Sequence, residues 1–376
     1  ERLNHVEPHL NSFAAVDADF AMQQARAVEK RLQAGAAVGE LAGLPVSVKD
    51  LIAVKGLPLR LGSKTSSQVL ASEDAVAVER LRRAGACIIG KTTTSEYGCK
   101  AVGDSPLTGI TRNPWNPART PGGSSAGAAA SVAAGVTSVA IGTDGAGSVR
   151  IPAALTGLFG IKPQFGRVPV FPPGGAPSLF HVGSLTRTVR DSALILEVMA
   201  GFDERDSGSM SAPVPRFRQA CSQGIAGMRI AWSPTLGFAR PDPEIVTITE
   251  KAVGILSELG AQVVEIGQVM DDPIKIWETE FFTSVGARLA DFLQDNPEQM
   301  DRGVMEKLRS ALHTSLLEYH RNSASRARFR ERNRWFFQSF DLLVTPTLPV
   351  AAFDIDLDVP PQLADRDLMS WVYYTY

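Results

Sequence analysis

Residues 120–152 read TPGGSSAGAAASVAAGVTSVAIGTDGAGSVRIP, and the stretch between Thr120 and Thr143 carries no charged side chain. Two loops rich in Ser and Gly, residues 122–127 and 144–148, enclose a run of small and β-branched residues. A membrane span needs about 20 mostly bulky apolar residues, which this stretch lacks. We therefore interpret residues 128–134 as a small-residue helix and residues 136–141 as a buried strand.

Outside this stretch, helical and strand-like segments alternate along the whole chain. This pattern is typical of an α/β sandwich with a mostly buried sheet. The polar, Pro-bearing segment 203–215 is the best hinge candidate, but no linker is long enough to require a second domain. We expect residues 1–376 to form one α/β domain. The predicted strands are 44–50, 87–89, 136–141, 228–232, 263–264 and 341–345, and the predicted helices are 18–32, 74–84, 128–134, 191–200, 243–259 and much of 273–340.

The overall composition excludes several classes of protein. The chain has 376 residues, with 38 Lys and Arg against 40 Asp and Glu, so nothing in its charge favours nucleic acid or an anionic membrane. Cys87, Cys99 and Cys221 form no CxxC pair, which argues against a disulfide framework and a structural metal site. No secretory signal is visible after Glu1. We therefore expect a cytoplasmic protein without a metal.

Two short strings match familiar motifs but lack the sequence context that each motif needs. Residues 85–92, GACIIGKT, match a P-loop, but the apolar middle is typical of a strand and no helix is predicted after Lys91. Residues 123–127, GSSAG, match the nucleophile elbow of an α/β-hydrolase esterase, with Ser125 in the centre. A Pro-rich loop precedes this string where the elbow needs a strand, and the downstream histidines have no recognisable context. We keep the elbow only as an alternative.

A serine nucleophile in this chain needs a base other than histidine. The chain has five histidines, none beside a Ser- or Gly-rich loop. Lys49 follows the apolar strand 46–48, and burial there lowers a lysine pKa toward neutrality. A structural ion pair between Lys49 and a carboxylate is an equally good interpretation of the local sequence. Residues 144–148, DGAGS, can turn several N–H groups one way to bind an oxyanion, or can form an ordinary tight turn.

Taken together, these segments resemble the amidase signature family of Ser–cis-Ser–Lys amide hydrolases. The two halves of the signature are similar to GGSSAG at 122–127 and GTDGAGSVRIP at 142–152, with Ser124 and Ser148 at the family's separation. Upstream, GLPVSVKD at 43–50 is similar to the segment that carries the family's lysine. Further matches occur at 90–97, 160–167 and 341–346, so the resemblance covers nearly the whole chain. The resemblance implies a single-domain α/β/α sandwich around a large mixed β-sheet.

The resemblance implies a role for each matched residue. Ser148 attacks the amide carbonyl, and Ser124, joined to Gly123 by a cis peptide bond, passes the proton to Lys49. The resemblance also implies that the glycine-rich segments form the oxyanion and substrate-binding site, that neighbouring side chains support the loop, and that no cofactor is needed. The oxyanion and substrate-binding set is Gly145, Ala146, Gly147, Gly122 and Gly123, and the supporting set is Ser125, Asp144 and Arg150.

The chain departs from the family pattern at two places. Ala146 stands between Gly145 and Gly147 where Thr-Gly-Gly is common, and we expect it to narrow the pocket. The family's C-terminal portion is expected to be absent after Tyr376. Within the family, the alternative is the glutaminase subunit of a tRNA-dependent amidotransferase, which usually carries Gln where this chain has Ile151. Outside the family, the alternative is an inactive scaffold. The presence of Lys49, Ser124 and Ser148 argues against that alternative.

The substrate class expected from the resemblance is a small aliphatic or aryl amide, or a carbamate- or urea-like compound. Esters are expected to react as well. The family is often dimeric, so a homodimer is the expected assembly.

Overall fold

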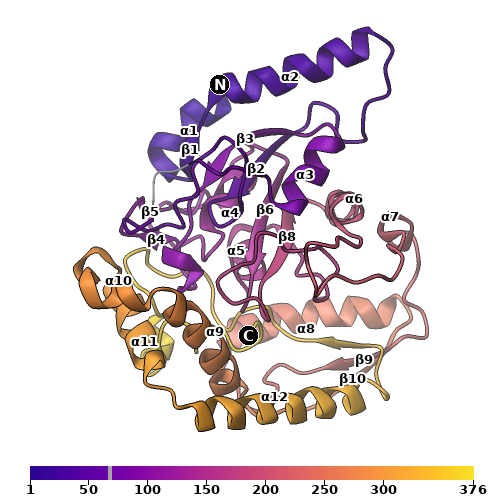
Figure 1. Ribbon diagram of the computed structural model, residues 1–376. Helices are drawn as coiled ribbons and strands as arrows, with labels where there is room; N and C mark the ends of the chain where they lie inside the picture. Colours follow the sequence, from indigo (N-terminus) through magenta and orange to yellow (C-terminus); the bar gives the residue numbers. More distant parts are fainter. Residues whose placement is uncertain (67–69) are drawn as a thin grey trace.

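The computed structural model describes residues 1–66 and 70–376 and has a six-stranded mixed sheet at its centre (Figure 1). The strand order is β1-β3-β2-β6-β8-β7. Strands β3, β2 and β6 are parallel neighbours, whereas β1, β8 and β7 pair antiparallel. The strands are β1 (Phe13–Val16), β2 (Pro45–Lys49), β3 (Cys87–Thr92), β6 (Val139–Asp144), β7 (Phe159–Gly160) and β8 (His181–Thr186).

Helices cover both faces of this sheet. On one face, α3 (Val76–Arg83) and α6 (Val189–Met199) pack against apolar side chains of β2, β3 and β6. On the other face, α4 (Ala126–Ala133) and α5 (Arg150–Thr156) pack against β6 and β8. This arrangement confirms the predicted α/β class. Two further helices near the N-terminus, α1 (Arg2–Leu10) and α2 (Ala18–Gln33), lie in the upper part of Figure 1.

Small residues let α4 approach the sheet closely. A Cβ atom added at Gly127 would lie 2.1 Å from the carbonyl oxygen of Ser12 and 2.5 Å from the amide nitrogen of Thr93. Any side chain at this position would therefore displace the helix. The helix predicted at 128–134 begins at Ala126 with Ser125 as its N-cap, so Ser124 lies one residue before the cap.

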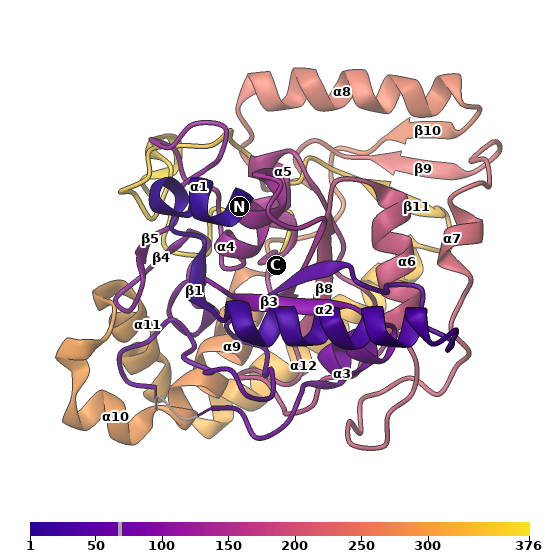
Figure 2. The same ribbon diagram turned by 90° about the horizontal axis from the view of Figure 1, so that it is seen from above.

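A second, three-stranded sheet lies apart from the first among the described residues (Figure 2). Its strands, β9 (Arg229–Trp232), β10 (Gln262–Glu265) and β11 (Leu342–Val344), are parallel in the order β10-β9-β11, and α8 (Pro243–Glu258) accompanies them. Apolar patterning predicted each of these strands but not that they form their own sheet. The hinge candidate 203–215 consists of turns and bends between α6 and α7 (Phe217–Ala220).

The stretch predicted to be mostly helical contains four helices. They are α9 (Ile274–Arg288), α10 (Ala290–Asp295), α11 (Arg302–Leu312) and α12 (Leu316–Phe336). Buried side chains of α9 and α11 share one core cluster with Trp371 and Tyr373 near the end of the chain. No helix in residues 1–66 and 70–376 is long and apolar enough to cross a membrane. The short remaining elements are η1 (Glu96–Gly98), β4 (Asp104–Ser105), β5 (Gly109–Ile110), η2 (Pro297–Gln299) and η3 (Pro361–Leu363).

Candidate active site

The carboxyl ends of β2 and β6 lie at the same edge of the sheet and bring the first site residues together. The two strands are parallel, with Val48 opposite Ile141. Lys49 ends β2, and Thr143 and Asp144 end β6. Because parallel strands share their carboxyl edge, segments almost 100 residues apart in the sequence meet here.

Lys49 is completely buried and contacts hydroxyl groups. Its Nζ donates to Ser124 Oγ at 2.7 Å and to Thr143 Oγ1 at 2.8 Å. No carboxylate of the described residues forms an ion pair with it. Burial lowers the pKa of Lys49 well below its ordinary value of 10.5, and the nearby Asp144 carboxylate opposes this only in part. The ion-pair interpretation of Lys49 is therefore wrong.

Lys91 shows what a structural lysine looks like in the same sheet. Its Nζ lies 3.0 Å from Asp50 Oδ1 and 3.1 Å from the Pro58 carbonyl oxygen, and both charged side chains are buried. The P-loop-like string is an extended strand here, β3, so its backbone cannot wrap a phosphate. The structural interpretation of that string is confirmed.

The two serines of the signature line one small cavity of about 30 Å³. Ser124 lies two residues before the start of α4, and the Gly123–Ser124 peptide bond is cis, as the resemblance implies. Ser148 lies just before α5 and is only 5% exposed. The Ser125 N–H donates to the Ser148 carbonyl oxygen at 3.1 Å, which ties the two serine-bearing loops together.

Ser125 does not have the surroundings of an esterase nucleophile. Its side chain is fully buried and its Oγ donates to the Thr143 carbonyl oxygen at 3.3 Å. His313 and His320 are exposed on the helical layer. The ring of His181 faces the carbonyl oxygens of Leu179 and Asp144. The elbow interpretation is therefore wrong, because the matching string begins a helix without a preceding strand.

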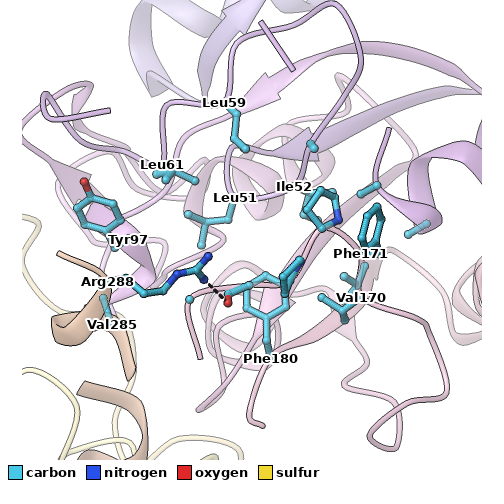
Figure 3. Close-up of a pocket in the computed structure, with 18 of the residues that line it drawn as sticks. Leu51, Ile52, Leu59, Leu61, Tyr97, Val170, Phe171, Phe180, Val285 and Arg288 are labelled. Atoms are coloured by element: carbon cyan, nitrogen blue, oxygen red, sulfur yellow. Dashed lines mark hydrogen bonds between the residues drawn. The ribbon is translucent and has the colours of Figure 1, made fainter. Parts of the chain in front are cut away.

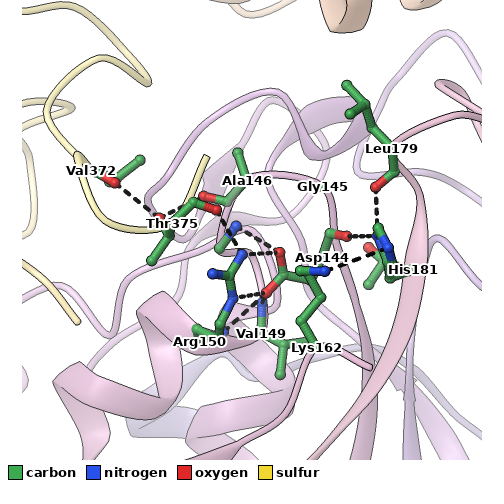
Figure 4. Close-up of polar contacts among 12 residues, drawn as sticks. Asp144, Gly145, Ala146, Val149, Arg150, Lys162, Leu179, His181, Val372 and Thr375 are labelled. Carbon is green, nitrogen blue, oxygen red and sulfur yellow. Dashed lines mark hydrogen bonds and ion pairs between the residues drawn. The ribbon is translucent and has the colours of Figure 1, made fainter. Parts of the chain in front are cut away.

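Asp144 organises the loop that carries Ser148 (Figure 4). Its Oδ1 accepts from the Gly147 N–H at 2.6 Å, and its carboxylate forms a two-bonded pair with Arg150 at 2.8 and 2.9 Å. Burial alone would raise the pKa of Asp144, but Arg150 and these hydrogen bonds together lower it to about 2. Lys162 contributes a further positive charge nearby. The carboxylate therefore stays ionised and fixes the turn.

The N–H groups of this loop differ in what they are free to bind. Those of Gly145, Ala146 and Ser148 donate to no acceptor in the described part of the chain, whereas that of Gly147 is used by Asp144. Gly147 was expected in the oxyanion set, and the structure corrects this. Among residues 145–148 only Gly147 has a left-handed backbone, with φ 111°, so the Cβ of Ala146 causes no backbone strain.

Gly122 and Gly123 serve close packing, which differs from the expected substrate contact. A Cβ at Gly123 would lie 2.0 Å from the Val102 carbonyl oxygen, and one at Gly122 would meet Ile151 at 2.9 Å. Neither glycine lines the serine cavity or its larger neighbour. Both therefore let the segment that carries Ser124 pack closely against its neighbours.

Three residues at the site were missed by sequence reasoning. Thr143 provides the second hydroxyl on Lys49 and lies inside the quoted stretch, so its position was a usable signal. Trp277 Nε1 donates to the Gly145 carbonyl oxygen at 2.7 Å, and Thr375 Oγ1 donates to that of Ala146 at 2.7 Å. These two come from segments more than 100 residues away, and no local pattern marks them.

A larger cavity of about 400 Å³ adjoins the serine cavity (Figure 3). Apolar side chains, glycines and prolines line most of it. Residues 171–175 form part of this wall, and Pro172 and Pro173 are exposed. The two cavities share Leu51, Tyr97, Gly175, Phe180 and Val285.

Comparison with known proteins identifies the family. The family model described as Amidase matches residues 1–375. The chain belongs to the amidase signature family. An acylamidase of Rhodococcus erythropolis is 35% identical over 387 residues, which cover 100% of this chain and 80% of that protein. The solved structure of a bacterial aryl acylamidase of this family superposes with a TM-score of 0.92 at 29% identity, covering 99% and 81% of the two chains.

The amidase is also similar to relatives with another role. One component of the glutamyl-tRNA(Gln) amidotransferase of Acidothermus cellulolyticus is 34% identical over 403 residues, which cover 98% of this chain and 79% of that protein. The family and its acylamidase members support an enzyme that hydrolyses amides. Among the described residues, no three His, Cys, Asp or Glu side chains cluster as a metal site would require.

Proposed function

We propose that this amidase cleaves amides with Ser148 as nucleophile, Ser124 as proton relay and Lys49 as base. The observation that carries the proposal is the surroundings of the buried Lys49 Nζ. This atom contacts two hydroxyl groups and, among the described residues, no carboxylate. A lysine held this way loses its proton easily, because its charged form lacks both water and a counter-ion. Ser124 then links the neutral amine to the cavity that Ser148 also lines.

The proton moves in step with bond formation. As Ser148 Oγ attacks the amide carbon, its proton passes to Ser124 Oγ, and the Ser124 proton passes to Lys49 Nζ. When the tetrahedral intermediate collapses, the C–N bond breaks and the same path returns a proton to the leaving amine nitrogen. Water then enters, gives its proton along the path and attacks the acyl-enzyme carbon. Release of the carboxylic acid restores Ser148 and neutral Lys49.

The oxyanion is stabilised by N–H groups of the loop before the nucleophile. Gly145, Ala146 and Ser148 supply N–H groups without an acceptor in the described part of the chain. The carbonyl oxygens of Gly145 and Ala146 accept hydrogen bonds from Trp277 and Thr375, and the Asp144–Arg150 pair fixes the turn. Donors preorganised in this way cost no rearrangement when charge develops on the substrate oxygen.

The substrate is an amide with a bulky apolar acyl or aryl portion, which occupies the larger cavity. About 400 Å³ of mostly apolar space favours such a group over an acetyl group. The acyl portion stays bound to Ser148 until water attacks, so it gains most from a pocket beside the nucleophile. Two relatives are named acylamidases, which agrees with an acyl amide as the substrate.

A glutaminase role fits these cavities less well. Glutamine carries an α-ammonium and an α-carboxylate, and its recognition needs a buried carboxylate and a cation in fixed positions. No Asp or Glu is among the described residues that line either cavity. Glutaminase activity that rises when partner subunits are added would reverse this ranking.

The homodimer and the cytoplasmic location stay predictions. Light scattering on the purified protein would check the homodimer.

The first test is intact-mass labelling with a fluorophosphonate. We expect one adduct that maps to Ser148, is absent from Ser148→Ala and forms much more slowly in Lys49→Ala. Ser125→Ala is the matched control and should label normally, because Ser125 faces the Thr143 carbonyl. Labelling of Ser125, or none in a folded sample, would contradict the proposal. Amine release from fatty-acyl and benzoyl 4-nitroanilides then measures the substrate class.

A further inference from the structure

One face of α9 runs from the oxyanion loop to the mouth of the larger cavity. Trp277 contacts Gly145 at one end, and Phe281 and Val285 follow at intervals of four residues along the lining of the serine cavity. Val285 also lines the larger cavity, and Arg288 lines it one turn further on. A helix rises about 1.5 Å per residue, so Arg288 lies about 17 Å from Trp277 along the axis. The helix therefore spans the length of a bound acyl group.

Arg288 is the one charged side chain among the described residues that line the two cavities. It is exposed and its Nη1 donates to the Gly174 carbonyl oxygen at 2.5 Å (Figure 3). No carboxylate in the described part of the chain pairs with it. A guanidinium has five N–H donors, so most of its binding capacity is unused.

The neighbouring charges are already engaged elsewhere. On α9, Glu280 pairs with Arg326 at 3.1 Å and Glu278 with Lys307 at 2.8 Å. On the other side of the segment 171–177, Arg205 pairs with Asp203 at 2.8 Å and with Glu79 at 2.8 Å. Arg288 thus differs from these cations in having no counter-charge among the described residues.

We propose that Arg288 determines specificity by binding a carboxylate at the far end of the acyl chain. The preferred substrate is then an amide whose apolar acyl portion fills the cavity and ends in an anionic group. A guanidinium binds a carboxylate through two parallel hydrogen bonds. This inference rests on the proposed amide hydrolysis at Ser148 and adds the chemical identity of the substrate's distal end.

The test compares mono-4-nitroanilides of straight-chain dicarboxylic acids with fatty-acyl 4-nitroanilides of equal chain length. The protein should prefer the carboxylate-ended member by about tenfold or more in kcat/KM at one optimal length, the usual scale for a hydrogen bond to a charged group. Raising the ionic strength should reduce the preference, because Arg288 is exposed. Equal kcat/KM for the two series at every length would overturn the proposal.

Three variants separate recognition from structure. Arg288→Gln keeps an N–H donor for the Gly174 carbonyl and removes the charge, so the preference should vanish. Arg288→Lys should retain part of the preference. Arg302→Gln, which removes an 88% exposed positive charge on α11, is the matched control and should behave as the unchanged protein. A preference that survives in Arg288→Gln would overturn the proposal.

Binding of the intact half-anilides gives a readout that needs no turnover. Titration calorimetry with Ser148→Ala should show tighter binding of a dicarboxylic half-anilide than of its methyl-ended analogue, and Arg288→Gln in the same background should abolish the difference. Equal affinities in Ser148→Ala would overturn the Arg288 proposal. Absence of hydrolysis of both series by the unchanged protein, with this difference in binding intact, would instead contradict the proposed function at Ser148.

Discussion

Lys49 and Lys91 lie at the ends of adjacent parallel strands, both fully buried, yet of the two only Lys91 has a carboxylate partner among the described residues. In the β2–β3 pairing Lys91 lies opposite Val48, whereas Lys49 lies opposite Thr92. Side chains alternate between the faces of a sheet, so the two amines point to opposite sides. Lys91 meets Asp50 on its side, and Lys49 meets Ser124 and Thr143 on the other. We therefore propose that the same residue type serves stability at Lys91 and catalysis at Lys49.

Replacing each lysine by methionine should separate these two roles. Lys49→Met should lower kcat by about 10²–10⁴-fold, the usual contribution of a general base. Lys91→Met removes the lysine partner of the buried Asp50 carboxylate and should cost about 3–5 kcal/mol of unfolding free energy. Urea denaturation and steady-state kinetics on a fatty-acyl 4-nitroanilide measure both effects. A normal kcat in Lys49→Met would rule out the role of Lys49 as base.

The pH dependence of kcat/KM should report the Lys49 amine. Only the neutral amine accepts a proton, so activity should rise with pH through the Lys49 pKa and level off well below 10.5. The Asp144 carboxylate raises that pKa, so Asp144→Asn should move the rising limb to lower pH. The variant should also lower kcat by about 10²–10³-fold, because the oxyanion loop loses its anchor. A shift of the limb to higher pH would contradict this assignment.

The stability of the protein should also reveal the lowered pKa. Because burial lowers the pKa of Lys49, the unfolded chain binds more protons between that pKa and 10.5, and the unfolding free energy rises with pH across this window. Lys49→Met lacks this contribution, so any stability advantage of the variant should shrink as pH rises. Urea midpoints of both proteins across neutral to alkaline pH measure the difference. A constant difference would mean an unperturbed lysine.

Thr375 should support catalysis through the loop without touching substrate. Its hydroxyl donates to the carbonyl of Ala146, and Thr375→Val keeps the shape while removing that bond. We expect kcat to fall about tenfold with little change in KM, because the oxyanion donors lose part of their alignment. Thr247→Val, which removes a similar hydroxyl-to-carbonyl bond on the exposed α8, is the control. Equal kcat values for both variants would remove Thr375 from the residues that support the loop.

The volume of the larger cavity should control acyl size. Ala77 is buried on α3 and lines this cavity without lining the serine cavity. Ala77→Leu should reduce kcat/KM for a benzoyl or fatty-acyl anilide by about tenfold or more while acetanilide hydrolysis is retained. Overpacking costs about 1–3 kcal/mol, so the Tm of the variant is measured beside its kinetics. Equal losses for small and large substrates would place the acyl group elsewhere.

Local patterning was enough to predict the elements that surround the proposed catalytic residues. The apolar run before Lys49 became β2, the small residues after Ser125 became α4, and the β-branched run before Thr143 became β6. These segments are buried on both sides, and their composition reflects that burial directly. The shared carboxyl edge of β2 and β6 then follows from parallel pairing.

The antiparallel strand β8 was not foreseen, and the reason is the mixed character of its sequence. It reads HVGSLT, with Gly183 and Ser184 in the middle, and it gains its place only by pairing with β6. The second sheet was missed for a related cause. Its strands were each recognisable, but β9 and β11 are separated by more than 100 residues, and nothing local indicates which strands pair.

The sequence by itself determined the groups on which the proposed chemistry rests: two Gly- and Ser-rich loops, a lysine after a buried strand, and five histidines that lie away from those loops. The tertiary structure decided which groups are available for it. It assigned the Gly147 N–H to Asp144 and brought Thr143, Trp277 and Thr375 to the site. It also built the apolar cavity that ends at Arg288. These depend on contacts between distant segments, whose geometry is set by packing of the whole core rather than by any local pattern.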